Sequence, residues 1–165
     1  MFLIASCSVV SAQHRTFGVR VGYSIGASGQ YYIGKENMLQ IDIDLLAYNW
    51  AVQSTITYNG VFFIKSWINN ELNAFVGIGI GGGYCWHSYY DGLGIISEEM
   101  LGRFWFIGAS TNLGLELNFK SGLQLFIDWR PVFAPVLYKD GSIDYFVEGL
   151  FIGACAIGVR YKFNK

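Results

Sequence analysis

The sequence predicts an all-β protein of one domain, in which eight strands form a closed antiparallel up-and-down barrel. Three observations support this fold. Apolar residues recur at every second position over most of the chain, which is the period of a strand. The 165 residues include 21 glycines and only 2 prolines, which is typical of a sheet with closely approaching backbones. Short connections alternate with longer ones, as an up-and-down order of strands requires.

The first segment has the character of an export signal and not of a strand. An apolar run, Phe2–Val10, is followed by small residues that favour cleavage after Ala12. Residues 1–12 are therefore expected to be a signal peptide, and residues 13–165 the mature domain. No basic residue precedes the run, so we interpret the signal as N-terminally truncated. A lipidation motif that ends at Cys7 is the alternative.

Four strands are expected in the N-terminal half. The first, Phe17–Gly26, has a face of aliphatic and aromatic residues opposite a face of small and charged residues. The second, Leu39–Leu45, alternates most regularly. The third, Val52–Tyr58, ends at Asn59-Gly60, a dipeptide that favours a tight hairpin turn. The fourth follows as Val61–Asn69.

The C-terminal half predicts four more strands. Leu72–Trp86 alternates aliphatic residues with glycines, which leaves space on one side of the sheet. Phe104–Phe119 leads through a turn at Lys120-Ser121-Gly122 into Leu123–Arg130, and Tyr145–Phe163 is the last strand. The longer connections are expected on the side opposite the chain termini, and they are Ala27–Asn37, His87–Arg103 and Val132–Asp144.

Composition and charge exclude several classes of protein. The chain is 53% hydrophobic with a mean hydropathy of +0.35, but no run approaches the roughly 20 apolar residues of a spanning helix. A helical membrane protein is therefore excluded. The 11 basic and 12 acidic residues give a net charge of -1, which offers no basic surface for nucleic acid. Cys85 and Cys155 lack the spacing of metal ligands or of a disulfide framework, so no metal or other cofactor is expected.

The contents of the polar face predict that it lines the interior. It combines glycines and serines with five basic and five acidic residues. In the fourth strand both faces are apolar, so Lys65 alone indicates that its odd-numbered positions face inward. A balanced set fits a narrow interior, because an isolated buried charge is strongly destabilising. A soluble lipocalin-like barrel, with this face in solvent, is the alternative. The expected interior charge network consists of Arg20, Asp42, Asp44, Lys65, Glu116, Asp128, Arg130, Glu148, Arg160 and Lys162.

The apolar face is then expected to meet lipid. Lipid offers no hydrogen-bond partner to an open sheet edge, so the eight strands must close into a ring. Amphipathic aromatic rings settle where a membrane meets water, at the ends of spanning strands. The aromatic residues expected there are Tyr23, Tyr58, Trp67, Tyr84, Trp86, Trp129 and Tyr161.

Three segments of the predicted strands are distinctive, and they are Leu113–Leu117, Asp128–Pro131 and Ile157–Phe163. They resemble segments of small outer-membrane β-barrel proteins of Gram-negative bacteria, particularly those of Bacteroidota. The resemblance implies an OmpA-like barrel in the outer membrane, with membrane lipids and the barrel-assembly machinery as partners. In that family the last strand ends in an aromatic assembly signal. Phe163 matches this signal, although two further residues follow it here.

The sequence favours a non-enzymatic barrel whose outer loops bind an extracellular ligand or protein, or cap the barrel, with both termini in the periplasm. An enzyme that modifies lipid A acyl chains is the alternative, with His87, Ser88 and Glu98 or Glu99 as its only comparable set. Neighbouring strand residues point to opposite faces, which disfavours a pair of His87 with Ser88. A small pore is the second alternative, and it is disfavoured because side chains fill an eight-stranded interior.

Overall fold

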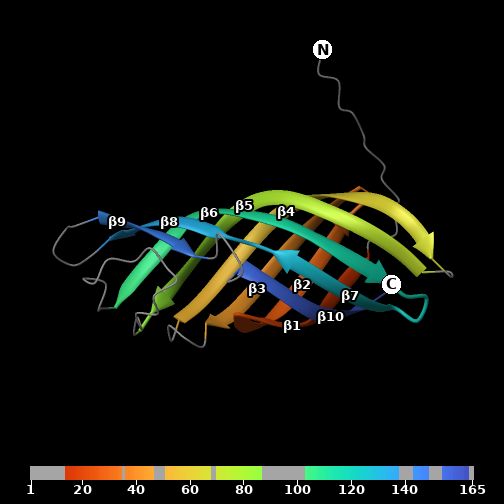
Figure 1. Ribbon diagram of the computed structural model, residues 1–165, viewed down its shortest axis with the longest axis horizontal. Helices are drawn as coiled ribbons and strands as arrows, with labels where there is room; N and C mark the ends of the chain where they lie inside the picture. Colours follow the sequence, from red (N-terminus) through yellow and green to blue (C-terminus); the bar gives the residue numbers. More distant parts are fainter. Residues whose placement is uncertain are drawn as a thin grey trace, which may run out of the picture.

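A computed structural model describes residues 14–34, 36–46, 51–67, 70–86, 103–137, 143–148 and 154–163. Within these ranges the chain forms one antiparallel sheet (Figure 1). Its strands are β1 (Arg15–Gly22), β2 (Ser24–Ile33), β3 (Asn37–Leu46), β4 (Ala51–Trp67), β5 (Asn70–Cys85), β6 (Phe104–Asn118), β7 (Leu123–Trp129), β8 (Val132–Leu137), β9 (Ile143–Glu148) and β10 (Cys155–Phe163). The described part contains no helix that is long and apolar enough to cross a membrane. The expected signal peptide, with Cys7, lies outside the described residues.

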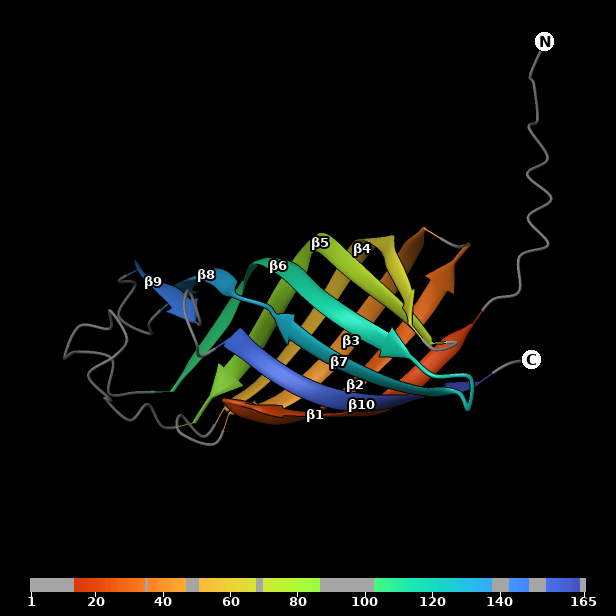
Figure 2. The same cartoon turned by 45° about the vertical axis from the view of Figure 1, so that its right-hand side comes forward.

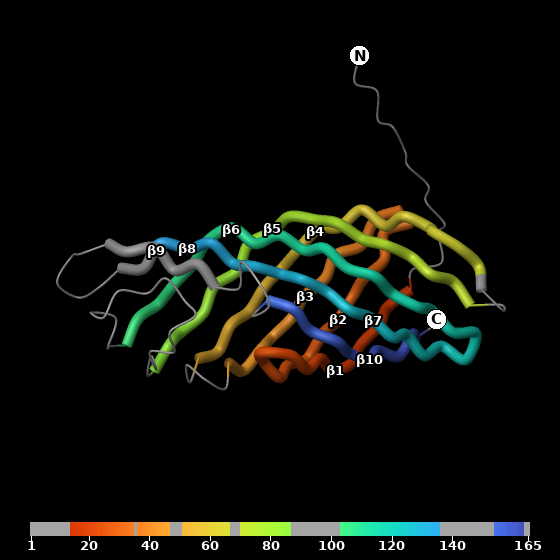
Figure 3. Tube along the Cα trace, viewed as in Figure 1, coloured from red at the N-terminus to blue at the C-terminus, as the bar shows by residue number. Residues whose placement is uncertain are grey.

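Eight of these strands form a ring, with the order β1-β2-β3-β4-β5-β6-β7-β10. The pairing of β1 with β10, from Arg15 opposite Phe163 to Gly22 opposite Ala156, joins the two ends of this order. β8 pairs with the part of β6 that β7 does not reach, and β9 pairs with β8. The β8–β9 pair therefore extends one side of the ring (Figure 1), and β8 continues beyond the end of β7 (Figure 3).

The two ends of the ring differ. The start of β1 and the end of β10 lie at one end (Figure 2), which also holds the β2–β3 turn at Gly34 and the β6–β7 turn at Gly122. We call this end the terminal rim. Gly34 and Gly122 have φ values of 76° and 87°, a conformation that favours glycine. The opposite end, the distal rim, holds the β1–β2 turn at Tyr23 and the junctions from β3 to β4 and from β5 to β6.

Exposed apolar side chains cover the outside of the ring, and seven charged side chains are buried inside it. Ile78 and Ile107 are 73% and 70% exposed, whereas Glu116 and Arg160 are fully buried. Each strand of the ring contributes an exposed aliphatic residue, for example Val19, Ile25, Ile43, Ile56, Ile78, Leu113, Ile127 and Ile157. This distribution is the inverse of that in a soluble domain, where apolar side chains form the core.

Glycines allow neighbouring strands to approach closely where the ring bends. A Cβ atom at Gly79 on β5 would overlap the carbonyl oxygen of Ile56 on β4. A Cβ atom at Gly18 on β1 would likewise overlap the carbonyl oxygen of Val159 on β10. A ring of only eight strands curves sharply, so these positions require the residue without a side chain.

The expected first strand, Phe17–Gly26, is wrong: it is two strands that meet at Tyr23. Val21 pairs with Ile25 across this turn, and both side chains face outward. Because Ile25 follows Val21 by four positions, an even number, the alternation of apolar residues continues through the turn and conceals it.

The hairpin expected at Asn59-Gly60 is also wrong. Asn59 lies within β4, opposite Met38 of β3 and Gly77 of β5. Pairing on both sides holds the dipeptide in an extended conformation, against its local preference for a turn. The missed turn and the false turn offset each other, so the expected number of strands agrees with the ring of eight.

Two of the three expected loops contain strands. Ala27–Asn37 belongs mostly to β2, and Val132–Asp144 includes all of β8. The pairing of β8 with β6 and β9 supplies partners for this backbone, so it does not form a loop. The third loop, His87–Arg103, lies outside the described residues except for Arg103.

Candidate functional site inside the ring

Seven charged side chains come together in the interior of the ring. Six of them project from inward positions of β1, β3, β6, β7 and β10, the seventh, Arg130, directly follows β7, and none is more than 4% exposed. The three arginines and four acidic residues give this set a net charge of -1. The seven residues are Arg20, Asp42, Asp44, Glu116, Asp128, Arg130 and Arg160.

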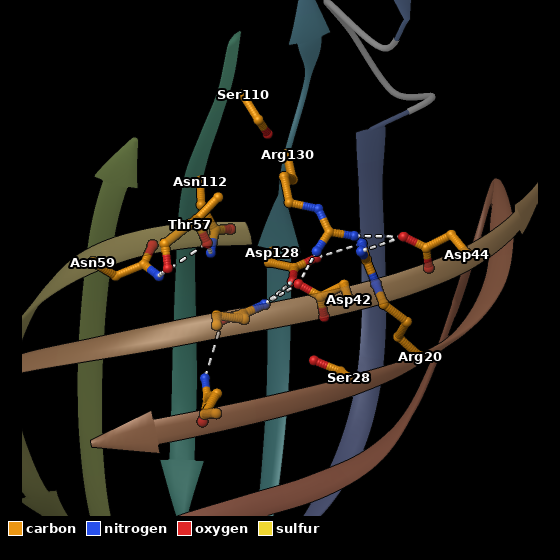
Figure 4. Close-up of polar contacts among 12 residues, drawn as sticks. Arg20, Ser28, Asp42, Asp44, Thr57, Asn59, Ser110, Asn112, Asp128 and Arg130 are labelled. Carbon is orange, nitrogen blue, oxygen red and sulfur yellow. Dashed lines mark hydrogen bonds and ion pairs between the residues drawn. The ribbon is translucent and has the colours of Figure 1, made fainter. Parts of the chain in front are cut away.

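Five of them form what we call the ionic cluster: Arg20, Asp42, Asp44, Asp128 and Arg130 (Figure 4). Arg20 donates to Asp44 Oδ2 at 3.1 Å and to Asp128 Oδ1 at 2.8 Å. Arg130 donates to Asp44 Oδ2 at 2.6 Å and also to Asp42 Oδ2. Each guanidinium thus joins two carboxylates, and the cluster links β1, β3 and the end of β7 across the interior.

Arg130 continues the inward positions of β7 just beyond the end of the strand, after the buried Phe126 and Asp128. β7 ends before Arg130, whose N–H donates to the carbonyl of Ala154 at 3.0 Å. The next residue, Pro131, has no N–H and so cannot continue the ladder of β7. Its carbonyl accepts from the N–H of Thr111 on β6 at 3.3 Å.

Glu116 is held in a different way, in what we call the carboxylate cage. Tyr32 Oη lies 2.9 Å from both carboxylate oxygens of Glu116. Side-chain amides supply the other donors, and the partners of Glu116 at 3.1 to 3.5 Å are Gln30, Asn73, Asn118 and Gln124. Five neutral groups therefore satisfy a fully buried carboxylate.

Arg160 is held by neutral partners as well. Its Nε and Nη2 donate to Ser28 Oγ at 2.9 and 2.7 Å, and its Nη1 donates to Gln124 Oε1 at 3.2 Å. The guanidinium carbon lies 3.4 Å from the centre of the Phe126 ring, within range of a cation–π interaction. Gln124 also donates to Glu116, so it connects Arg160 to the carboxylate cage.

Apolar side chains fill the interior toward both rims. The cluster toward the distal rim consists of Leu46, Ala51, Cys85, Phe104, Phe106, Val132 and Ala134. The cluster toward the terminal rim consists of Tyr32, Met38, Val61 and Phe75. The charged groups thus lie between two apolar layers, where water is largely excluded.

A small pocket, partly open to solvent, lies beside the ionic cluster, and Arg20, Asp44, Gln53 and Arg130 are among the residues that line it. Four buried atoms of these residues have no protein partner among the described residues, and they are Arg20 Nε, Asp44 Oδ1, Gln53 Oε1 and Arg130 Nε. Two donors and two acceptors around one small space match the bonding of ordered water. The described part has no group of His, Cys, Asp and Glu that could hold a metal ion.

Three residues of the expected network do not join it. Lys65 is exposed, because the register of β4 shifts between Phe63 and Lys65. The shift pairs Lys65 with Leu72, on the outward face of β5, so the inward phase expected from Lys65 is wrong for this residue. Lys162 is half-buried at the terminal rim, and the side chain of Glu148 lies outside the described part.

Exposed aromatic residues gather near both rims. Near the distal rim, the Tyr84 ring lies 5.4 Å from Trp86 and 4.5 Å from Trp105, measured between ring centres. Trp105 is 71% exposed and was missing from the expected aromatic set, although it alternates with inward residues of β6. At the terminal rim, the rings of Tyr161 and Phe163 lie 5.3 Å apart at the end of β10.

The other expected boundary aromatics are placed differently. Tyr58 is exposed but lies in the middle of β4, because the turn expected beside it does not exist. Tyr23 and Trp129 are half-buried, and the side chain of Trp67 lies outside the described part.

Sequence reasoning missed most of the neutral partners. Gln30 and Tyr32 were assigned to a loop, although they continue the inward positions of Ser24 and Ser28. Gln124 shares the inward face of β7 with Asp128. A periodic pattern extended to Ile33 would have found Gln30 and Tyr32.

The candidate catalytic set of His87, Ser88, Glu98 and Glu99 lies outside the described residues, so its geometry is not given by this structure. The described site contains arginine, carboxylate and amide groups that pair mostly with one another. No family model matches this chain, and no curated protein matches it either.

Proposed function

We propose that the chain is an outer-membrane β-barrel of the OmpA-like kind, non-enzymatic, with both termini in the periplasm. One observation supports this most strongly: exposed aliphatic residues surround the ring, while fully buried charges fill it. Soluble monomers rarely expose continuous apolar surfaces of this extent. Hydrocarbon is the solvent that favours such an outer surface, and a ring leaves no open edge in it.

The soluble alternative is disfavoured by the same observation. A lipocalin-like barrel would enclose an apolar interior suited to a ligand. Here Glu116 and Arg160 are fully buried, and Ile78 is 73% exposed. A pore is disfavoured because ion pairs and two apolar clusters occupy the interior.

The proposed partners follow from the membrane location. Outer-membrane lipids surround the exposed band, and Phe163, 52% exposed at the end of β10, is the proposed signal to the barrel-assembly machinery. The outer connections at the distal rim bind an extracellular ligand or protein, or cap the barrel. Residues 1–12 are the proposed export signal.

Reconstitution tests the proposal directly. The purified chain should need detergent to stay monodisperse, should enter lipid vesicles, and should migrate differently on gels before and after boiling, because a folded barrel resists unfolding by detergent. Monodisperse protein in plain buffer, with identical migration of boiled and unboiled samples, would contradict the membrane location.

Two further measurements address the alternatives. Lipid A from cells with and without the protein should have the same mass if the barrel is not an acyl-modifying enzyme. Single-channel recording should detect no conductance if the buried charges and apolar clusters close the interior. A changed acyl composition would favour the enzyme and would direct attention to His87 and Ser88.

A further inference from the structure

The terminal rim has an excess of basic side chains. Among the described residues at this rim, the exposed cations are Arg15, Lys65 and Lys120, and Lys162 is half-buried. The acidic residues described there are Glu36 and Glu71, both exposed. The described side chains of this rim, four cations and two anions, therefore carry a net charge of +2.

Two of the cations border the apolar outer band. Arg15 starts β1, two positions before the exposed Phe17, and its guanidinium carbon lies 5.5 Å from the centre of the Tyr31 ring. Lys65 shares the outward face with Leu72. Long aliphatic stems can lie along apolar surface while the charged ends reach the polar boundary.

The register shift in β4 is what places Lys65 at this border. Odd positions of β4 are buried from Ala51 to Val61, so an uninterrupted strand would direct Lys65 into the ring. The irregularity between Phe63 and Lys65 turns it outward. A cation is thereby removed from an interior with little room for it and added to the outer edge of the rim.

At the distal rim, Arg103 is the exposed cation among the described residues. It therefore offers a matched cation at the end of the ring opposite the terminal rim.

We propose that the terminal rim binds the headgroup phosphates of anionic phospholipids in the leaflet around it. The inference rests on the proposed membrane location and adds a lipid partner and an orientation. Lysine and arginine at a membrane boundary attract anionic lipids through the surface potential, and the attraction weakens as salt increases. The terminal rim has such a boundary, because its exposed cations lie next to the apolar outer band and Arg15 lies over the Tyr31 ring.

Spin-labelled lipids test the proposal. The full chain is reconstituted in phosphatidylcholine vesicles, and electron spin resonance measures the lipid immobilised by the protein. We expect phosphatidylglycerol to associate roughly three to five times more strongly than phosphatidylcholine. This ratio should fall toward about one in R15Q/K65Q/K120Q, whereas the matched variant R103Q should retain it. High salt should lower the ratio of the unaltered protein in the same way, which provides the test without a variant.

The outcomes separate the two proposals. Absence of any immobilised lipid would mean that the protein does not enter the bilayer, and the proposed membrane location would fail. Immobilised lipid without preference for phosphatidylglycerol would overturn the headgroup proposal alone. A preference that survives in the triple variant and in high salt, or that R103Q also abolishes, would overturn it as well.

Discussion

The ionic cluster and the carboxylate cage bury negative charge in two different ways. In the ionic cluster, two arginines hold three aspartates, and each guanidinium joins two carboxylates. In the cage, five neutral groups hold Glu116 alone. The first solution depends on few groups that each make several contacts, whereas the second distributes the same task over many groups.

This difference predicts unequal sensitivity to substitution. Removal of one partner of a buried ion pair leaves an uncompensated charge, which costs far more than the net value of the pair. Removal of one of five hydrogen-bond donors leaves four in place. The ionic cluster should therefore be intolerant of single substitutions, and the cage should tolerate them.

The largest effect is expected for Arg130→Met. Among the described residues, Asp42 has an ion pair with Arg130 alone, whereas Asp44 has ion pairs with both Arg20 and Arg130. The substitution therefore leaves Asp42 without a cation and Asp44 with Arg20. We expect the free energy of unfolding in detergent micelles, measured by urea titration, to fall by about 3–5 kcal/mol. Arg103→Met, at an exposed position, should change it by less than about 0.5 kcal/mol. Equal effects of the two variants would contradict an interior role for Arg130.

The sequence predicts that Arg130 faces the interior but does not predict its partners. The structure pairs Arg130 with Asp42 and Asp44 of β3. β3 lies across the ring from the end of β7, and such a contact depends on how the sheet curves. Alternation assigns a residue to a face and does not identify its partner across the ring.

A second substitution can identify the carboxylate that Arg130→Met leaves without a cation. Adding Asp42→Asn to Arg130→Met removes the carboxylate left without a cation, so the double variant should recover about 1–2 kcal/mol of the loss. The measurement is a double-mutant cycle from urea unfolding. If the double variant were less stable than Arg130→Met alone, Asp42 would not be the destabilising group.

A residue can be assigned to the correct face of the sheet even where the ends of its strand are predicted wrongly. The turn at Tyr23 preserves the phase of Val21 and Ile25, so the inward position of Arg20 was predictable although the strand was not divided there. The interior position assigned to Lys65 failed because one extra residue in β4 reverses the phase, and no residue type marks that insertion.

Glu116→Gln should have a smaller effect than Arg130→Met. The substitution weakens the bonds from Tyr32 and the surrounding amides, but it also removes a buried charge from a set whose net charge is -1. These contributions oppose each other, and we expect a loss of about 1 kcal/mol in the same urea titration. A loss as large as that of Arg130→Met would mean that the cage has no more tolerance than the ionic cluster.

The smallest effect is expected for Asn118→Ala, which removes one donor from the cage. Asn118 lies 3.2 Å from Glu116 Oε1 and also accepts from Gln124 at 2.9 Å, but it is only half-buried, so water can replace it. We expect a loss of about 0.5 kcal/mol, near the low end for one hydrogen bond, because Tyr32 and Asn73 still donate to the same oxygen. Tyr32→Phe, which removes the fully enclosed hydroxyl, is the comparison within the cage and should cost more. Equal losses would mean that burial of the donor does not decide its contribution, and that the cage behaves as a single unit.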